Sequence, residues 1–178
     1  ITLHGDTATI KGVKGLTVVN VRVAFLTHLH SDHTIGYVDL ILTPWSVGRS
    51  QPLEVYGPKG LKHMTDHLLE AYREDIAIRR RDKQILGVPE QAEGYKVHAH
   101  EITPGTVYKD QNVTVKAFLV NHGDVPRAFG YRIETSDRTI VISGDAAPSQ
   151  SVIDSCNGCD VLIHEAYSMM TYNAVSPA

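Results

Sequence analysis

Most of this chain consists of short apolar runs separated by polar stretches. Val21–Thr27 has the pattern of a buried strand, and Leu53–Tyr56 that of a second, which the turn signal Gly-Pro-Lys-Gly closes. The same reasoning predicts five further strands, at Tyr95–Ile102, Val113–Val120, Ala128–Glu134, Thr139–Ser143 and Asp160–His164. In Tyr95–Ile102, Val97 and Ala99 share one face, and His98 and His100 share the other, exposed face.

Three helices are predicted between these strands. Ile35–Trp45 has the pattern of a short helix that Pro44 stops, and Leu61–Ile78 repeats apolar residues every three or four positions. Pro148–Ser155 fits a third, short helix. Strands with inserted helices predict an α/β or α+β layered domain, and a length of 178 residues fits one domain spanning residues 1–178.

Composition and charge narrow the expected partners. The net charge is −3 and the pI about 6.4, so the chain lacks the basic face that nucleic-acid binding usually needs. The basic run Arg79–Arg81 is followed by Asp82 and fits a solvated helix end. No stretch approaches the roughly 20 apolar residues of a membrane helix. We therefore expect neither a nucleic-acid nor a membrane partner. Localisation is not readable, because the chain lacks an initial Met and the N-terminus is interpreted as missing or processed.

The strongest chemical signal is the segment His28-Leu-His-Ser-Asp-His33, directly after the first predicted strand. A loop leaving a strand end can turn several side chains toward one point. Imidazole nitrogens and a carboxylate oxygen suit Zn²⁺ or a similar metal, and grouping them without a cation would be costly. A polar surface loop is the alternative interpretation.

Two later residues stand at equivalent places, since His122 and Asp145 each follow an apolar strand. A strand that delivers a polar residue at a sheet edge builds a site on a rigid frame. Cys156 and Cys159 form a single C-x-x-C, for which a purely structural role and a local disulfide both stay open.

The pattern H-x-H-x-D-H, then a lone His, then an Asp after Ser-Gly, resembles the metallo-β-lactamase superfamily. Asn121–Ile133, Thr139–Asp145 and Asp160–Tyr167 are similar to its ribonuclease Z and arylsulfatase branch, and the likeness runs from about Val21 to Tyr167. The resemblance implies an αββα sandwich, which we expect to be incomplete at both termini.

The resemblance also implies two divalent metal ions, with Zn favoured and Mn or Fe as alternatives. His28, His30 and His122 would hold the first metal, Asp32 and His33 the second, and Asp145 would bridge both. The family adds a C-terminal histidine for which this chain has no matching position. Asp32 could also orient the attacking hydroxide or accept its proton. His164 and Glu165 are further catalytic candidates, although His164 could instead bond to backbone.

These ligands favour a dinuclear metal-dependent hydrolase in which a metal-bridging hydroxide attacks a phosphodiester or sulfate ester of a small molecule. Hydrolysis of a lactone or a β-lactam is an alternative. A tRNA 3′-processing endonuclease is disfavoured, because the segment between Tyr72 and Tyr95 is modest in length and mixed in charge, unlike a protruding basic arm. A non-catalytic metal-binding domain is the last alternative. The resemblance is compatible with a homodimer.

Overall fold

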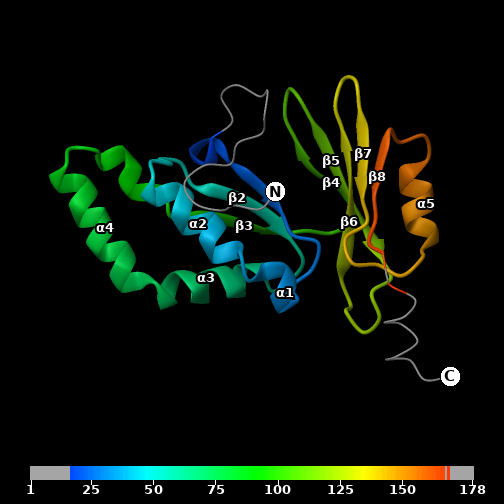
Figure 1. Ribbon diagram of the computed structural model, residues 1–178, viewed down its shortest axis with the longest axis horizontal. Coiled ribbons are helices and arrows are strands. Elements are labelled where there is room, and N and C mark those ends of the chain that lie inside the picture. Colours follow the sequence, from blue (N-terminus) through cyan, green and yellow to red (C-terminus); the bar gives the residue numbers. More distant parts are fainter. Residues whose placement is uncertain (1–16, 167, 169–178) are drawn as a thin grey trace. The chain divides into compact units, whose positions relative to one another are not determined.

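The computed structural model describes residues 17–166 and residue 168. The chain divides into two compact units, with the boundary between Glu101 and Ile102. The N-terminal unit contains a three-stranded parallel sheet in the order β1-β2-β3 (Figure 1). Its strands are β1 (Val23–Phe25), β2 (Leu53–Gly57) and β3 (Val97–Glu101). Its helices are η1 (Val18–Asn20), α1 (Ser31–Thr34), α2 (Tyr37–Ser46), α3 (Leu61–Ala71), α4 (Arg73–Ile85) and η2 (Pro89–Glu93).

The C-terminal unit contains a five-stranded sheet in the order β4-β5-β6-β7-β8. Neighbouring strands are antiparallel except for the parallel pair β7 and β8, where helix α5 makes the crossover. The elements are β4 (Gly105–Lys109), β5 (Thr114–Val120), β6 (Ala128–Glu134), β7 (Thr139–Ile142), α5 (Gln150–Cys156) and β8 (Val161–Ile163).

Each unit buries its own apolar core. In the N-terminal unit, alternate residues of β2 pack with α2 and α3 in a cluster of five buried side chains, which are Tyr37, Ile41, Leu53, Val55 and Leu61. In the C-terminal unit, α5 packs on the sheet through a cluster of Val120, Ala128, Ala146 and Val152. The predicted strand faces are confirmed here, since Val97 and Ala99 pack against the first cluster. Within the described residues, no helix has the length and apolar character that crossing a membrane requires.

Helix α2 continues two residues beyond Pro44, so the prediction that Pro44 stops it is wrong. Proline has no N–H, and therefore the carbonyl of Leu40, four residues earlier, loses its helical donor. The buried guanidinium of Arg49 replaces that donor: Nη1 bonds Leu40 O at 3.2 Å, and Nη2 bonds Ile41 O at 2.6 Å. The same guanidinium also bonds Gly94 O at 3.1 and 3.3 Å. Arg49 thus ends α2 and ties it to the segment before β3.

The predicted helix Leu61–Ile78 is two helices, α3 and α4, which meet at Tyr72. Tyr72 leaves helical geometry, with φ −100° and ψ 13°. Glu74 and Asp75 lie in the first turn of α4, where negative charge is favoured by the helix dipole. The apolar repeat therefore marked the start of the helical segment correctly but did not show its break at Tyr72 or its continuation to Ile85.

The two cysteines form a disulfide, Cys156–Cys159, which realises one of the two alternatives left open by the sequence. It joins the last residue of α5 to the residue before Asp160. Asp160 in turn bonds the start of β7, accepting from Thr139 N at 2.7 Å and donating its own N–H to Thr139 O at 2.8 Å. The disulfide and these two hydrogen bonds therefore fix the segment between α5 and β8.

Candidate metal centre

Three imidazoles gather where the chain leaves β1. His28 is almost fully buried, and its ring lies 4.7 Å from the ring of His30 and 4.3 Å from that of His33, measured between centroids. Thr27 Oγ1 lies 3.1 Å from His28 Nδ1, which fixes the orientation of that ring. Thr27 was not singled out from the sequence, although its place directly before the first histidine is a usable signal for such a partner.

The short helix α1 makes this convergence possible. It begins directly after His30, and Thr34 Oγ1 donates to His30 O at 2.8 Å, which closes the turn. The turn brings His33 back beside His28. Asp32 lies on the outer side, with its side chain 78% exposed and its Oδ2 3.5 Å from His33 Nε2. The structure therefore brings the three predicted histidines together and places Asp32 at their solvent side.

His122 and Asp145 come together in the C-terminal unit. Their Nε2 and Oδ2 atoms are 3.6 Å apart, and each side chain is about one-fifth exposed. The loops that carry them follow β5 and β7, and a hydrogen bond of 2.8 Å from Ala147 N to Asn121 O joins these loops. Gly144 has φ +66°, a conformation that glycine adopts without strain, so it allows the turn that presents Asp145.

Glu165 supports this second pair of residues. Its Oε1 accepts the N–H of Ala146, and its carboxyl group is hydrogen-bonded to that of Asp145. Burial, followed by this contact with Asp145, raises the pKa of Glu165. His164 instead turns to its own backbone, with Nδ1 2.9 Å from Glu165 O, and is exposed. Thus Glu165 contacts a predicted ligand, and His164 makes the backbone bond that the sequence left as its alternative role.

The chemistry of both groups fits a divalent metal. Imidazole nitrogens and carboxylate oxygens are the ligands that Zn²⁺ takes in sites without thiolates. One group supplies three histidines and Asp32 from the N-terminal unit, and the other supplies His122 and Asp145 from the C-terminal unit. The assignment of these residues to particular metal ions stays a prediction.

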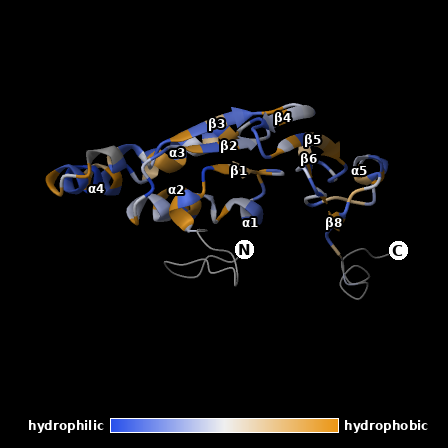
Figure 2. Ribbon diagram, turned by 90° about the horizontal axis from the view of Figure 1, so that it is seen from above, coloured by the Kyte–Doolittle hydropathy of each residue, from blue (hydrophilic) through white to orange (hydrophobic). Residues whose placement is uncertain are grey.

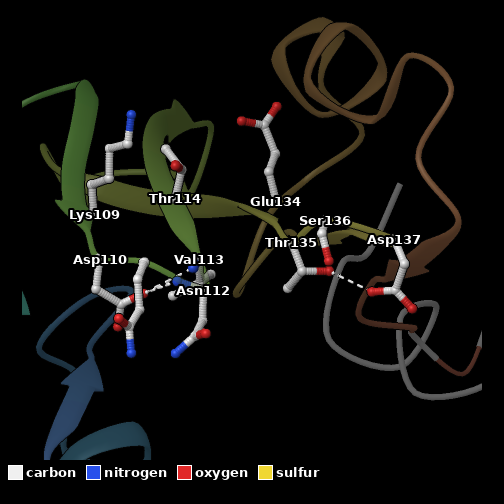
Figure 3. Close-up of a pocket in the computed structure, with 10 residues that line it drawn as sticks. Lys109, Asp110, Asn112, Val113, Thr114, Glu134, Thr135, Ser136 and Asp137 are labelled. Carbon is white, nitrogen blue, oxygen red and sulfur yellow. Dashed lines mark hydrogen bonds between the residues drawn. The ribbon is translucent and has the colours of Figure 1, made fainter.

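A separate open hollow of about 580 Å³ lies at the turns β4–β5 and β6–β7 (Figure 3). Its polar groups already make hydrogen bonds within the two turns. Asp110 Oδ1 accepts the backbone N–H groups of Asn112 and Val113 at 2.7 and 2.9 Å, and Thr135 donates to Asp137 at 3.0 Å. Hydrogen bonds from Asn112 N–H, the Tyr108 hydroxyl and Val113 N–H hold the pKa of Asp110 below its ordinary value. The hollow is therefore turn structure and holds none of the predicted ligands.

The sequence of this chain is similar to those of known proteins of one superfamily. Residues 7–173 match the family described as the beta-lactamase superfamily domain. Ribonuclease Z of Mycobacterium sp. strain KMS is 30% identical over 85% of this chain and 52% of its own length. That of Mycobacterium marinum is 31% identical over 84% and 53%. The chain thus spans about half the length of these curated relatives.

Solved structures with a similar fold include a relative of the same kind as the sequence matches. The short form of human tRNase Z is 25% identical, with a TM-score of 0.59 over 86% of this chain and 61% of that one. Zinc-bound PqqB of Methylobacterium extorquens, at 15% identity and a TM-score of 0.54, has a similar fold. The predicted α+β fold class is therefore confirmed.

One prediction about partners is wrong. We expected no nucleic-acid partner, yet the matching relatives are named for cleaving RNA, and one structural relative for cleaving tRNA. The expectation rested on net charge and on the segment between Tyr72 and Tyr95, which forms α4 and η2. That reasoning covered only about half the length of the relatives, so it could not exclude RNA recognition. The chain belongs to the metallo-β-lactamase superfamily.

Proposed function

We propose that this chain forms part of a metal-dependent ribonuclease that cleaves a phosphodiester bond in a tRNA precursor. Supporting this are its histidine and carboxylate groups, combined with relatives named ribonuclease Z and tRNase Z. The observation that carries the proposal is that the rings of His30 and His33 both lie beside the buried ring of His28, where the chain leaves β1. This replaces the small-molecule ester as the preferred substrate.

The metal set is proposed as the resemblance gives it. His28, His30 and His122 would hold one ion, Asp32 and His33 would hold a second, and Asp145 would be a ligand of both. When bound, such ions lower the pKa of water to near neutrality and stabilise the charge that develops on the phosphate. Zn²⁺ is the preferred ion for this ligand set.

Three side chains have proposed roles besides metal binding. Asp32, whose exposed side chain lies beside His33, would orient the attacking hydroxide or accept its proton. Glu165 holds the loop that carries Asp145 through the N–H of Ala146, and so acts as a positioning residue. Thr27 fixes the ring of His28. Loss of such an outer partner typically lowers metal affinity or activity about 10- to 100-fold.

Two assays test the proposal together. Purified protein loaded with Zn²⁺ should shorten a precursor tRNA that carries a 3′ extension, and H28A and D145N should abolish this cleavage. H63A/H67A is the matched control, because those two histidines lie exposed on α3. Metal equivalents, counted by elemental analysis, should fall in H28A and D145N and stay unchanged in the control.

The outcomes separate the alternatives. Cleavage of aryl sulfate or a chromogenic phosphodiester without cleavage of tRNA would restore the small-molecule ester. Full metal binding without any hydrolysis would favour the non-catalytic metal-binding domain. Unchanged metal content in both H28A and D145N would refute the proposed ligands.

A further inference from the structure

Most of the described basic side chains are paired with an acidic neighbour. On α4, where Figure 2 shows many hydrophilic residues in blue, Arg79 bonds Asp75 at 2.9 Å, and the two arginines that follow have acidic partners as well. Within the described residues, the basic side chains that make neither an ion pair nor a hydrogen bond are Arg22, Lys59, Lys109 and Arg127. Such a cation can bind a phosphate without first giving up an acidic partner.

Lys59 lies on a loop beside the histidines that follow β1. Strands β1 and β2 are parallel neighbours, so the loops that leave their carboxyl ends lie side by side. A Cβ added at Gly60 would lie 3.2 Å from Leu29 Cδ1, so the loop after β2 touches the residue between His28 and His30. Lys59 directly precedes Gly60 and is exposed. The crevice outside the carboxyl ends of parallel strands is a usual place for a ligand.

The loop that carries Lys59 is held in shape by hydrogen bonds. Leu61 N donates to Pro58 O at 3.1 Å, which closes a turn around Lys59. Glu101 Oε1 accepts the N–H of Gly60 at 2.8 Å. This carboxylate is thus bonded to the backbone of the loop, and it forms no ion pair with Lys59 among the described contacts. Lys59 is therefore presented to solvent on a fixed turn.

The C-terminal unit, considered by itself, has a comparable cation. Val120 pairs with Ala128 at the end of the β5–β6 hairpin, and the loop between them carries both His122 and Arg127. Val125 N donates to His122 O at 3.1 Å, and the side chain of Val125 packs against the core cluster of this unit, which anchors the loop. Arg127 is exposed. Each group of predicted ligands thus has an exposed cation on its own loop or on the adjoining one.

The other two cations without a partner lie at the opposite strand ends. Arg22 directly precedes β1, whereas the histidines follow that strand. Lys109 lies at the turn between β4 and β5, whereas His122 follows β5. Position, and not only the lack of an acidic partner, therefore distinguishes Lys59 and Arg127.

We propose that Lys59 and Arg127 each bind a backbone phosphate of the RNA substrate, close to the bond that is cut. This inference rests on the proposed function. RNA carries a negative charge at each phosphate, and a lysine or arginine that reaches a phosphate releases a bound counterion, which favours binding at low salt. Both residues would hold the RNA in place, and neither would bind a metal ion or transfer a proton.

The test measures kcat and KM for a precursor tRNA with a 3′ extension, using the Zn²⁺-loaded full chain at several salt concentrations. K59A and R127A should each raise KM and leave kcat unchanged, because the lost contact holds the substrate equally before and during cleavage. One phosphate contact adds about 0.7–0.9 to the slope of log affinity against log salt, so the KM advantage of the parent over either variant should shrink about threefold between about 50 and 200 mM salt. In K59A/R127A the two losses of slope should add.

The matched control is K109A/R138A, which removes the same charge. Lys109 and Arg138 lie at the β4–β5 and β6–β7 turns, at the other end of their sheet from the loops of His122 and Asp145. This control should keep the KM and the salt slope of the parent. K59R and R127K keep the positive charge and should also keep the parent slope. Circular dichroism first shows that each variant is folded.

The outcomes separate this inference from the proposed function. If K59A/R127A and K109A/R138A have the same KM and the same salt slope, the inference is overturned, although cleavage by the parent chain still supports the nuclease. A normal slope in one single variant overturns the contact of that residue alone. If the parent chain cleaves no precursor tRNA, the proposed function fails, and this inference fails with it.

Discussion

Replacing Arg49 tests how the N-terminal unit tolerates a proline inside α2. The R49A substitution removes the guanidinium donors to three carbonyl groups, those of Leu40, Ile41 and Gly94. Burial, and secondly the charge of Arg22, lowers the pKa of Arg49 to about 10, so the guanidinium is still charged at neutral pH. Arg49 is only 1% exposed, so its removal leaves these carbonyls facing a buried cavity and not bulk solvent.

The expected cost follows from those three acceptors. A buried polar group left without a partner costs about 1–3 kcal/mol, which gives a range of about 3–9 kcal/mol. Water that enters the space left by the side chain recovers part of this, so we expect a loss of about 4 kcal/mol. For a chain of this size, about 2–4 °C of melting temperature accompanies each kcal/mol, which predicts a drop of about 8–16 °C.

Fluorescence of Trp45 is a suitable assay, because it is the single tryptophan of the chain and lies in α2. Thermal and urea unfolding of R49A and R49K are compared with R73A, which removes an exposed ion pair with Glu70 worth under about 1 kcal/mol. R49K keeps the charge but loses the planar fork, so it should fall between the other two. A drop below about 3 °C for R49A would refute the role given to the guanidinium.

Three further predictions concern the C-terminal unit. G130A should cost about 1–3 kcal/mol in urea unfolding, because its new Cβ would lie 2.3 Å from the ring of Phe118 and 3.0 Å from a backbone oxygen; wild-type stability would contradict this. Hydrogen bonds, first from Arg132, lower the pKa of Glu134. Its contribution should therefore be present above about pH 4.5 and lost as the pH falls further, so that E134Q is less stable than the parent at pH 7 by under about 1 kcal/mol and equal to it near pH 3. Reducing Cys156–Cys159 should lower the free energy of unfolding, measured in urea, by no more than about 2 kcal/mol, since the closed loop is short.

The sequence predicted most strands well because their apolar patterns are strong and local. Ala128–Glu134 forms β6 with the predicted bounds, and Val113–Val120 and Thr139–Ser143 differ from β5 and β7 by one residue each. Strand β4 was missed, since Gly105–Lys109 has only two half-buried residues and depends on its neighbour β5. Tertiary pairing, rather than local pattern, makes that segment a strand.

In the candidate site, too, local sequence patterns predicted some features, and others depend on how the strands pair. The histidines of the first group follow one another in the sequence, so the pattern itself indicated their convergence. The contact of Glu165 with Ala146 depends on the pairing of β7 with β8, which no local pattern reveals. Outside that site, the hydrogen bonds of Glu54 with His98 and His100 depend likewise on the register of two parallel strands more than 40 residues apart. Sequence reasoning placed the two histidines on an exposed face but could not supply their partner.

The two sheets differ in how far apart along the chain their partners lie, and this has a consequence for folding. Strands β4, β5 and β6 each pair antiparallel with the strand that follows, so short hairpins can build most of that sheet. Strands β1, β2 and β3 pair in parallel and must first close loops that contain all the larger helices of their unit. Closing long loops before any contact is gained slows folding. We therefore expect protection of amide hydrogens in β5 and β6 to precede that in β2 during refolding.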